Sequence, residues 1–333
     1  MATLADVARH AGVAASTVSY VLSGKRSVSA ATRHRVERSI ELLDYHPHAG
    51  ARALASNRSS IIALVVPVHT DPYVPVLMET TIAVTSFARR FGYDVLLLTN
   101  DEGAEGIRRV AVSARADAMI LLDVSMDDER IPMLREASID AVLIGVPADP
   151  GGLDCVDLDF AAAGERCVAH LAALGHREVA FIGEAPAVYQ RRSGFAERTV
   201  AGVTGEAAAR GIRMVHRPCE GSHEAAAATV TRILEDRPGT TGLIVQNEAI
   251  VSPLLSVLRT AGRVVPEEMS VVAICPDQVA ERTAPHLTSV AIPAQEIGLR
   301  AVELLARRLD DGAGSGVILL PPRLTVRAST APA

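Results

Sequence analysis

Apolar residues near the start of the chain recur at helical spacing in three short segments. The first segment, which Gly12 ends, has one apolar face made by Leu4, Val7, Ala8 and Ala11. A second helix is predicted over 15–23, only three residues later, and a third from Ser29 to about Tyr45. Two helices joined by a tight glycine-containing turn, with a third closing the core, form a helix-turn-helix arrangement.

From Ile61 the pattern changes to short apolar runs separated by amphipathic segments of helical length. The first series of runs covers 61–66, 94–98, 118–122 and 141–144, and the second covers 155–158, 178–182, 214–217, 242–245 and 270–274. Such alternation predicts parallel sheets with right-handed crossovers. Two series predict two doubly wound subdomains that face each other across a cleft. Because the runs 287–292 and 318–320 lie beyond both series, we expect the chain to cross between the subdomains near them.

These patterns predict an α/β chain with an all-α helix-turn-helix head over 1–46 and a hinge helix and linker over 47–60. The body covers 61–333. Its first subdomain is expected at about 61–156 and 291–320, and its second at about 157–290 and 321–333.

Composition excludes several classes of protein. Hydrophobic residues make up 49% of the 333 residues, which is too many for a disordered chain, yet no apolar run approaches the ~20 residues of a membrane span. Four scattered cysteines form neither a disulfide framework nor a zinc motif, and the absence of an export signal predicts a cytoplasmic protein. The sequence also lacks a glycine-rich phosphate loop, a metal-ligand cluster and a nucleophile motif, so we expect no enzyme, catalytic residue, metal or cofactor.

Charge is distributed unevenly along the chain. Residues 1–58 hold eight basic and four acidic residues, a net charge of +4, whereas the remainder holds 25 basic and 35 acidic residues, a net charge of −10. A small basic head on a large acidic body is typical of a module that binds a polyanion, attached to a second function.

Several motifs follow one another in a fixed order. The head carries Leu4-Ala5-Asp6-Val7-Ala8 and Ser16-Thr17-Val18-Ser19-Tyr20-Val21-Leu22-Ser23-Gly24, and the body carries Leu174-Gly175-His176-Arg177-Glu178, Arg191-Arg192-Ser193-Gly194-Phe195 and Leu320-Pro321-Pro322-Arg323-Leu324. In this order the motifs resemble the LacI/GalR family of transcriptional repressors, essentially from end to end. The resemblance implies a periplasmic-binding-protein-like body and a homodimer whose paired heads bind a pseudo-palindromic operator in double-stranded DNA.

The resemblance assigns base reading to Ala15, Ser16 and Tyr20 in the second helix. Ser16 can donate or accept a hydrogen bond, and Ala15 can offer its methyl group to a thymine methyl. Further contacts, mainly to the DNA backbone, are implied for Thr3, Thr17, Ser19, Ser23, Arg26, Tyr45 and Ala51. An ordinary solvated helix face stays the alternative for Ser16 and Tyr20.

Leu54 lies in a short alanine-rich segment after Pro47. A helix this short is marginal without a partner. By resemblance, paired hinge helices enter the minor groove and the leucine at this position separates a central base step. A buried contact between domains is the alternative for Leu54.

Effectors of the resembled family bind between the subdomains. Carried over by position, the effector-binding residues here are Tyr73, Asp159, Arg191, Asn247 and Cys275. Arg191 suits a hydroxyl pair or a carboxylate, and Tyr73 offers a flat apolar wall. An ordinary helix-capping acid is the alternative for Asp159.

Two positions depart from the family pattern. Glu248 replaces the aspartate of an Asn-Asp pair, and Cys275, a poor hydrogen-bonding group, replaces the aspartate that usually holds effector hydroxyls. The expected small-molecule effector is a sugar or another metabolite, and these departures favour a less polar ligand or a cleft no longer in use.

Two other functions stay open. A regulator of the same fold controlled by a protein partner, or by no effector, is the first alternative. A solute-binding protein is the second, which the head over 1–58 disfavours. No leucine heptad follows the last predicted strand, so we expect a dimer and not a coiled-coil tetramer.

Overall fold

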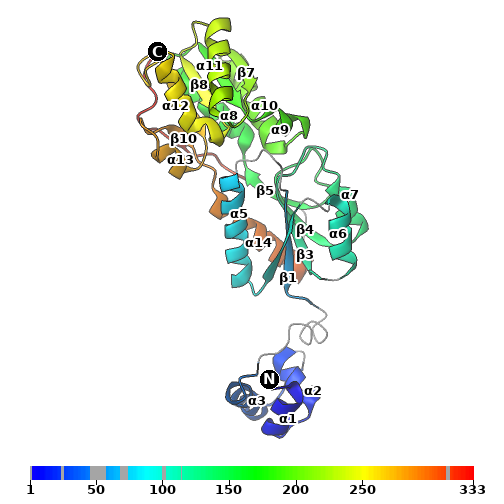
Figure 1. The fold of residues 1–333 in the computed structure, drawn as a ribbon. Coiled ribbons are helices and arrows are strands. Elements are labelled where there is room, and N and C mark those ends of the chain that lie inside the picture. The colour runs from blue at the N-terminus through cyan, green and yellow to red at the C-terminus, as the bar shows by residue number, and fades with distance from the viewer. Residues whose placement is uncertain are drawn as a thin grey trace.

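A computed structural model describes residues 2–23, 26–45, 58–67, 74–99, 103–113, 115–312 and 316–333. The head consists of α1 (Leu4–Ala11), α2 (Ala15–Ser23) and α3 (Ala30–Leu42) (Figure 1). Each helix contributes a fully buried valine to one small core, namely Val7, Val18 and Val36. The head therefore has the predicted three-helix arrangement.

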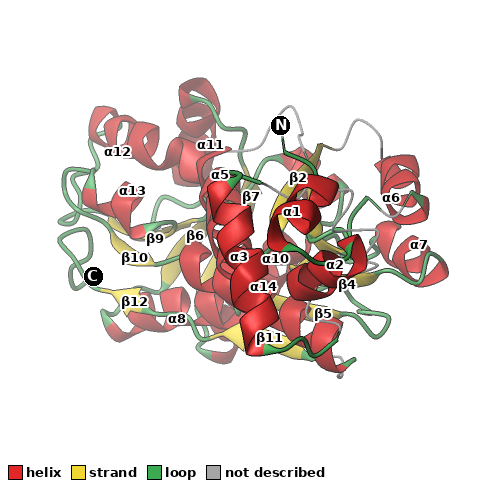
Figure 2. Ribbon diagram, turned by 90° about the horizontal axis from the view of Figure 1, so that it is seen from below, coloured by secondary structure: helices red, strands yellow, loops and turns green. Residues whose placement is uncertain are grey.

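The first body sheet is parallel, in the order β11-β5-β4-β3-β1-β2. Its strands are β1 (Ile61–Val66), β2 (Asp94–Thr99), β3 (Ala118–Leu121), β4 (Asp140–Ile144), β5 (Asp154–Leu158) and β11 (Val317–Leu320). The helices around it are α5 (Val74–Arg90), α6 (Gly103–Val112), α7 (Arg130–Glu136) and α14 (Ala294–Asp311). Helices α5 and α14 cover one face of the sheet, and α6 and α7 cover the other (Figure 2).

The second sheet has the order β12-β10-β9-β8-β6-β7, and only β12, at its edge, is antiparallel. Its strands are β6 (Glu178–Gly183), β7 (Arg213–Pro218), β8 (Gly242–Val245), β9 (Ser270–Ile274), β10 (Thr288–Val290) and β12 (Leu324–Thr325). The surrounding helices are α8 (Phe160–Ala173), α9 (Pro186–Gln190), α10 (Gly194–Ala209), α11 (His223–Asp236), α12 (Val251–Thr260) and α13 (Asp277–Glu281). Helices α8 and α10 pack on one face, and α11 and α12 on the other.

The chain passes between the subdomains three times: after β5, between β10 and α14, and between β11 and β12. The last two passages lie near the runs 287–292 and 318–320, where the sequence predicts crossings. Within the part of the chain that the structure describes, none of the helices is both long and apolar enough to cross a membrane.

Three features differ from the sequence prediction. The run 155–158 opens the second predicted series, but as β5 it pairs with β4 and β11 in the first sheet. The amphipathic segment between the runs 118–122 and 141–144 becomes helical only at Arg130, because the Asp128 carboxylate accepts hydrogen bonds from the backbone N–H groups of Ser125 and Arg130 and closes a turn there. The pattern also missed α14, whose buried face includes small residues such as Ala294 and Ala301.

Candidate nucleic-acid interface and effector cleft

The outer face of α2 is polar and open. Ala15 and Ser16 are exposed, and Thr17, Ser19 and Tyr20 are half-buried. The Arg26 guanidinium carbon lies 5.4 Å from the centroid of the Tyr20 ring, a distance at which the cation and the ring attract each other. Tyr20 and Arg26, both predicted to contact DNA, thus lie side by side.

Other predicted DNA contacts are placed differently. Thr3 caps α1: its hydroxyl accepts the Asp6 backbone N–H, and the Asp6 carboxylate accepts the Thr3 backbone N–H at 2.9 Å. Tyr45 is only 4% exposed and packs in the core of the head, and its contact with the DNA backbone stays a prediction. The side chain of Ser23, together with Ala51, Leu54 and Tyr73, lies outside the described residues.

The body holds its first residues firmly. The Asp117 carboxylate accepts hydrogen bonds from the Ser59 backbone N–H at 2.6 Å, the Ser59 hydroxyl at 2.8 Å and the Ser60 backbone N–H at 2.8 Å. Arg58 donates to the Leu309 carbonyl, near the end of α14, at 2.7 Å. The chain that enters β1 from the linker is therefore attached to two elements of the first subdomain.

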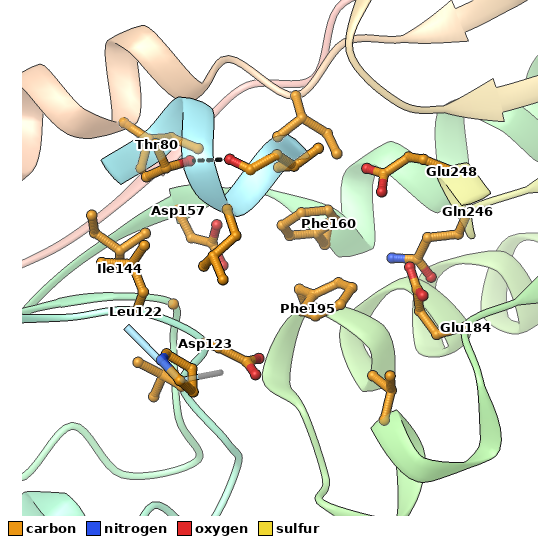
Figure 3. Close-up of a pocket in the computed structure, with 18 of the residues that line it drawn as sticks. Thr80, Leu122, Asp123, Ile144, Asp157, Phe160, Glu184, Phe195, Gln246 and Glu248 are labelled. Carbon is orange, nitrogen blue, oxygen red and sulfur yellow. Dashed lines mark hydrogen bonds between the residues drawn. The ribbon is translucent and has the colours of Figure 1, made fainter. Parts of the chain in front are cut away.

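A cavity of about 170 Å³ lies between the subdomains (Figure 3). Side chains just beyond the carboxyl ends of parallel strands line it: Asp123 after β3, Glu184 after β6, and Gln246 and Glu248 after β8. A crevice outside the carboxyl ends of the strands is where open α/β sheets bind ligands. The cavity is therefore the candidate effector site.

Among the described residues, four carboxyl groups line the cavity with a single guanidinium, that of Arg191. Arg191 lies 3.8 Å from Asp123, which also accepts the Ser193 hydroxyl at 2.6 Å. Burial raises the pKa of Asp157 to about 7, and it does the same for Glu184, with a smaller contribution from the charge of Asp123. Burial and the neighbouring Glu184 raise the pKa of Glu248 well above its usual range.

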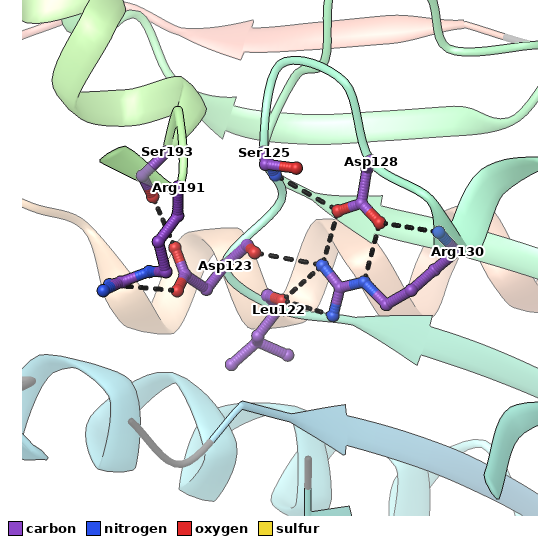
Figure 4. A network of polar contacts seen from close by, with 7 residues as sticks. All are labelled: Leu122, Asp123, Ser125, Asp128, Arg130, Arg191 and Ser193. Atoms are coloured by element: carbon purple, nitrogen blue, oxygen red, sulfur yellow. Dashed lines mark hydrogen bonds and ion pairs between the residues drawn. The ribbon is translucent and has the colours of Figure 1, made fainter. Parts of the chain in front are cut away.

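A network behind Asp123 fixes the loop that carries it (Figure 4). Arg130 binds the Asp128 carboxylate at 2.6 Å and also donates to the Leu122 and Asp123 carbonyls at 3.2 and 3.0 Å. The same loop joins the second subdomain, because the Gly194 backbone N–H donates to the Val124 carbonyl at 3.0 Å. This hydrogen bond between the loop and the second subdomain joins the two walls of the cavity on one side.

The structure places one of the predicted effector residues, Arg191, in the cavity lining. Asp159 caps α8 by accepting the Ala162 backbone N–H at 3.0 Å. Asn247 accepts from the Ala249 backbone N–H at 3.1 Å and donates to the Cys219 carbonyl at 2.8 Å. Cys275 is fully buried in the core of the second subdomain.

Sequence reasoning missed five polar residues of the described lining, namely Thr80, Asp123, Asp157, Glu184 and Gln246. All but Thr80 and Asp157 follow a predicted strand within two residues, a position that could have indicated them. The cavity is therefore more polar than the cysteine at position 275 suggested.

Comparisons with known proteins agree with this architecture. Bacterial regulatory proteins of the lacI family match residues 3–48, and the periplasmic binding protein-like domain matches residues 168–330. The transcriptional regulator CelR of Thermobifida fusca is 30% identical over 98% of both chains. The chain belongs to the LacI family. It is thus a DNA-binding transcriptional regulator, as the helix-turn-helix head predicts.

Two solved structures of LacI-family proteins resemble this one over nearly its whole length. The CelR–cellobiose complex has a TM-score of 0.72 and 27% identity, and the match covers 99% of this chain and 100% of CelR. The lac repressor dimer bound to operator and an anti-inducer has a TM-score of 0.83 and covers 99% of both chains. At 24% identity, this second match shows the shared fold alone.

Proposed function

We propose that this LacI-family chain binds an inverted-repeat operator as a homodimer, as a repressor in the cytoplasm, and that a small molecule in the cleft between its subdomains changes its affinity for DNA. The observation that carries the proposal is the cavity at the carboxyl ends of both sheets, in a chain that also has an exposed polar recognition helix. It favours control by a small molecule over control by a protein partner.

The head supports the DNA-binding part of the proposal. Ser16 is exposed on α2, and the Arg26 guanidinium next to Tyr20 can pair with a phosphate. The operator complex of the lac repressor was solved as a dimer. Two heads related by a two-fold axis would bind an inverted repeat.

The cavity supports the effector part. Arg191 and several carboxyl groups face a space large enough for a small metabolite, with Phe160 and Phe195 as apolar walls. CelR, at 27% identity, was solved with cellobiose, so sugars are one class of candidate effector.

The test is binding-site selection from random DNA with the purified full-length chain, followed by a metabolite screen on the selected sequence. We expect an inverted repeat and at least one metabolite that shifts the affinity. Ser16→Ala should weaken binding to the selected sequence, whereas exchange of the exposed Glu267 for Gln should not. Equal affinity for the selected and random DNA, with and without metabolites, would refute the proposal.

A further inference from the structure

The polar groups of the cavity are mostly hydrogen-bond acceptors. Its described lining contains the carboxyl groups of Asp123, Asp157, Glu184 and Glu248, whereas Arg191 is its one guanidinium and is paired with Asp123 at 3.8 Å.

Gln246 adds a buried acceptor that is ready for a ligand. Its side chain is only 2% exposed, and its Nε2 donates to the Thr199 hydroxyl at 2.9 Å. That hydroxyl in turn donates to the Phe195 carbonyl at 2.9 Å, so it can only accept from Gln246. The orientation of the amide is thereby fixed, and among the described residues its Oε1 has no partner. Buried polar atoms without a partner are rare, and one that lines a cavity points to a missing donor.

Glu184 and Glu248 lie beside Gln246 on the wall of the second subdomain (Figure 3). Within the described part of the chain, no side chain donates a hydrogen bond to either carboxyl group. Burial raises the pKa of both groups, and the charge of Glu184 raises the pKa of Glu248 further. The titratable groups that face them are Asp123 and Arg191 for Glu184, and Glu184 together with the neutral thiol of Cys275 for Glu248. Without a ligand, this wall therefore favours protonated carboxyl groups.

The opposite wall, on the first subdomain, carries Asp123 and Asp157, and the rings of Phe160 and Phe195 lie between the walls (Figure 3). The two ring centroids are 5.5 Å apart. Among the described residues, no three His, Cys, Asp or Glu side chains are grouped closely enough to hold a metal ion. The acceptors are spread over two walls with an apolar middle, an arrangement that suits an extended organic molecule.

We propose that the effector is an organic cation whose protonated amine is bound by Glu184, Glu248 and the Gln246 amide oxygen. Its apolar part lies against Phe160 and Phe195, and hydroxyl groups or a second amine are directed to Asp123 and Asp157. This assignment rests on the proposed effector site and names the chemical class of its ligand. A neutral sugar also supplies donors, but it would leave these carboxyl groups protonated and could form only neutral hydrogen bonds, which are weaker than charge-assisted ones.

The test compares matched amine and alcohol probes by isothermal titration calorimetry with the full-length chain. The pairs are glucosamine with glucose, galactosamine with galactose, and 1,4-diaminobutane with 1,4-butanediol. We expect at least one amine to bind about 10-fold or more tightly than its alcohol, since charge-assisted hydrogen bonds are roughly twice as strong as neutral ones. The isosteric variants Glu184→Gln and Glu248→Gln should each weaken amine binding about 10-fold, and the exposed control Glu267→Gln should not.

A second measurement needs no variant. At pH 6.5 a bound amine should ionise the carboxyl groups of Glu184 and Glu248, so titrations in phosphate and in MES, two buffers of different ionisation enthalpy, should show protons released on binding. Binding without proton release, binding of the neutral members only, or binding of neither member would overturn the amine assignment. If the operator selection still succeeds in those cases, only the ligand class is wrong; if it also fails, the proposed function is wrong.

Discussion

Replacement of Asp157 by Asn should make the stability of the chain less dependent on pH. Asp157 is 6% exposed, and among the described residues its carboxyl group accepts only the backbone N–H of Leu158 at 2.9 Å, a bond that an Asn side chain can keep. Burial raises its pKa from 3.8 to about 7, against a smaller opposite effect of Arg198, while Asp123 and Asp159 also raise it. The folded chain therefore holds a proton that the unfolded chain releases.

The direction and the size of the pH effect on stability follow from this difference in protonation between the folded and the unfolded chain. Because the folded-state pKa is raised, the stabilising contribution of the protonated group is complete below pH 3.8 and is lost as the pH rises through about 7. Between pH 5 and pH 7 the loss spans two pH units, and at 1.36 kcal/mol per unit it is about 2 to 3 kcal/mol. The raised pKa values of Glu184 and Glu248 affect the stability of wild type and variant in the same way. The difference in unfolding free energy between the two chains therefore isolates the contribution of Asp157.

Urea unfolding at pH 5 and pH 8 measures this contribution. The free energy of unfolding of Asp157→Asn relative to wild type should increase by about 2 to 3 kcal/mol from the lower to the higher pH. The exposed control Glu267→Gln should show no such change. A pH-independent difference between Asp157→Asn and wild type would refute the burial argument.

Three further predictions concern packing and DNA. A Cβ at Gly202 would overlap the Ala161 carbonyl where α10 crosses α8, so Gly202→Ala should lower the unfolding free energy by about 1 to 3 kcal/mol. The control Gly205→Ala, in open space on α10, should leave the unfolding free energy unchanged or raise it. Equal melting temperatures of the two variants would contradict the close approach of α10 and α8. Leu54→Ala should weaken specific operator binding in a mobility-shift titration and leave effector binding unchanged. Unchanged operator affinity would exclude a role of Leu54 in separating the central base step. Operator affinity should fall with salt at a log–log slope of about −0.9 per phosphate contacted, and a slope near zero would contradict binding by the basic head.

Local patterns predicted the elements well. The head helices follow from apolar spacing and from caps such as Gly12 and Ser29, which are properties of neighbouring residues. Sheet membership depends on distant partners, and for that reason β5 was predicted in the wrong sheet. Helix α14 was missed although its buried residues, which include Ile297, Ala301 and Leu305, recur at helical spacing.

The cleft was predicted less completely than the fold. Strand ends indicate where a cleft lies, but not which of the adjacent side chains turn into it. Asn247 bonds to its own turn and to Cys219, while its neighbours Gln246 and Glu248 line the cavity. Matching positions with the resembled family predicted that Arg191 lines the cleft, but it could not show that Cys275 is buried in the core.

The attachment of Ser59 and Ser60 to Asp117, and of Arg58 to the end of α14, has a mechanical consequence. The start of β1 is thereby tied to its subdomain, so a rotation of that subdomain would carry the first residues of the body with it. In a two-chain assembly, such a rotation would therefore change the distance between the two points at which the chains leave the bodies toward the heads.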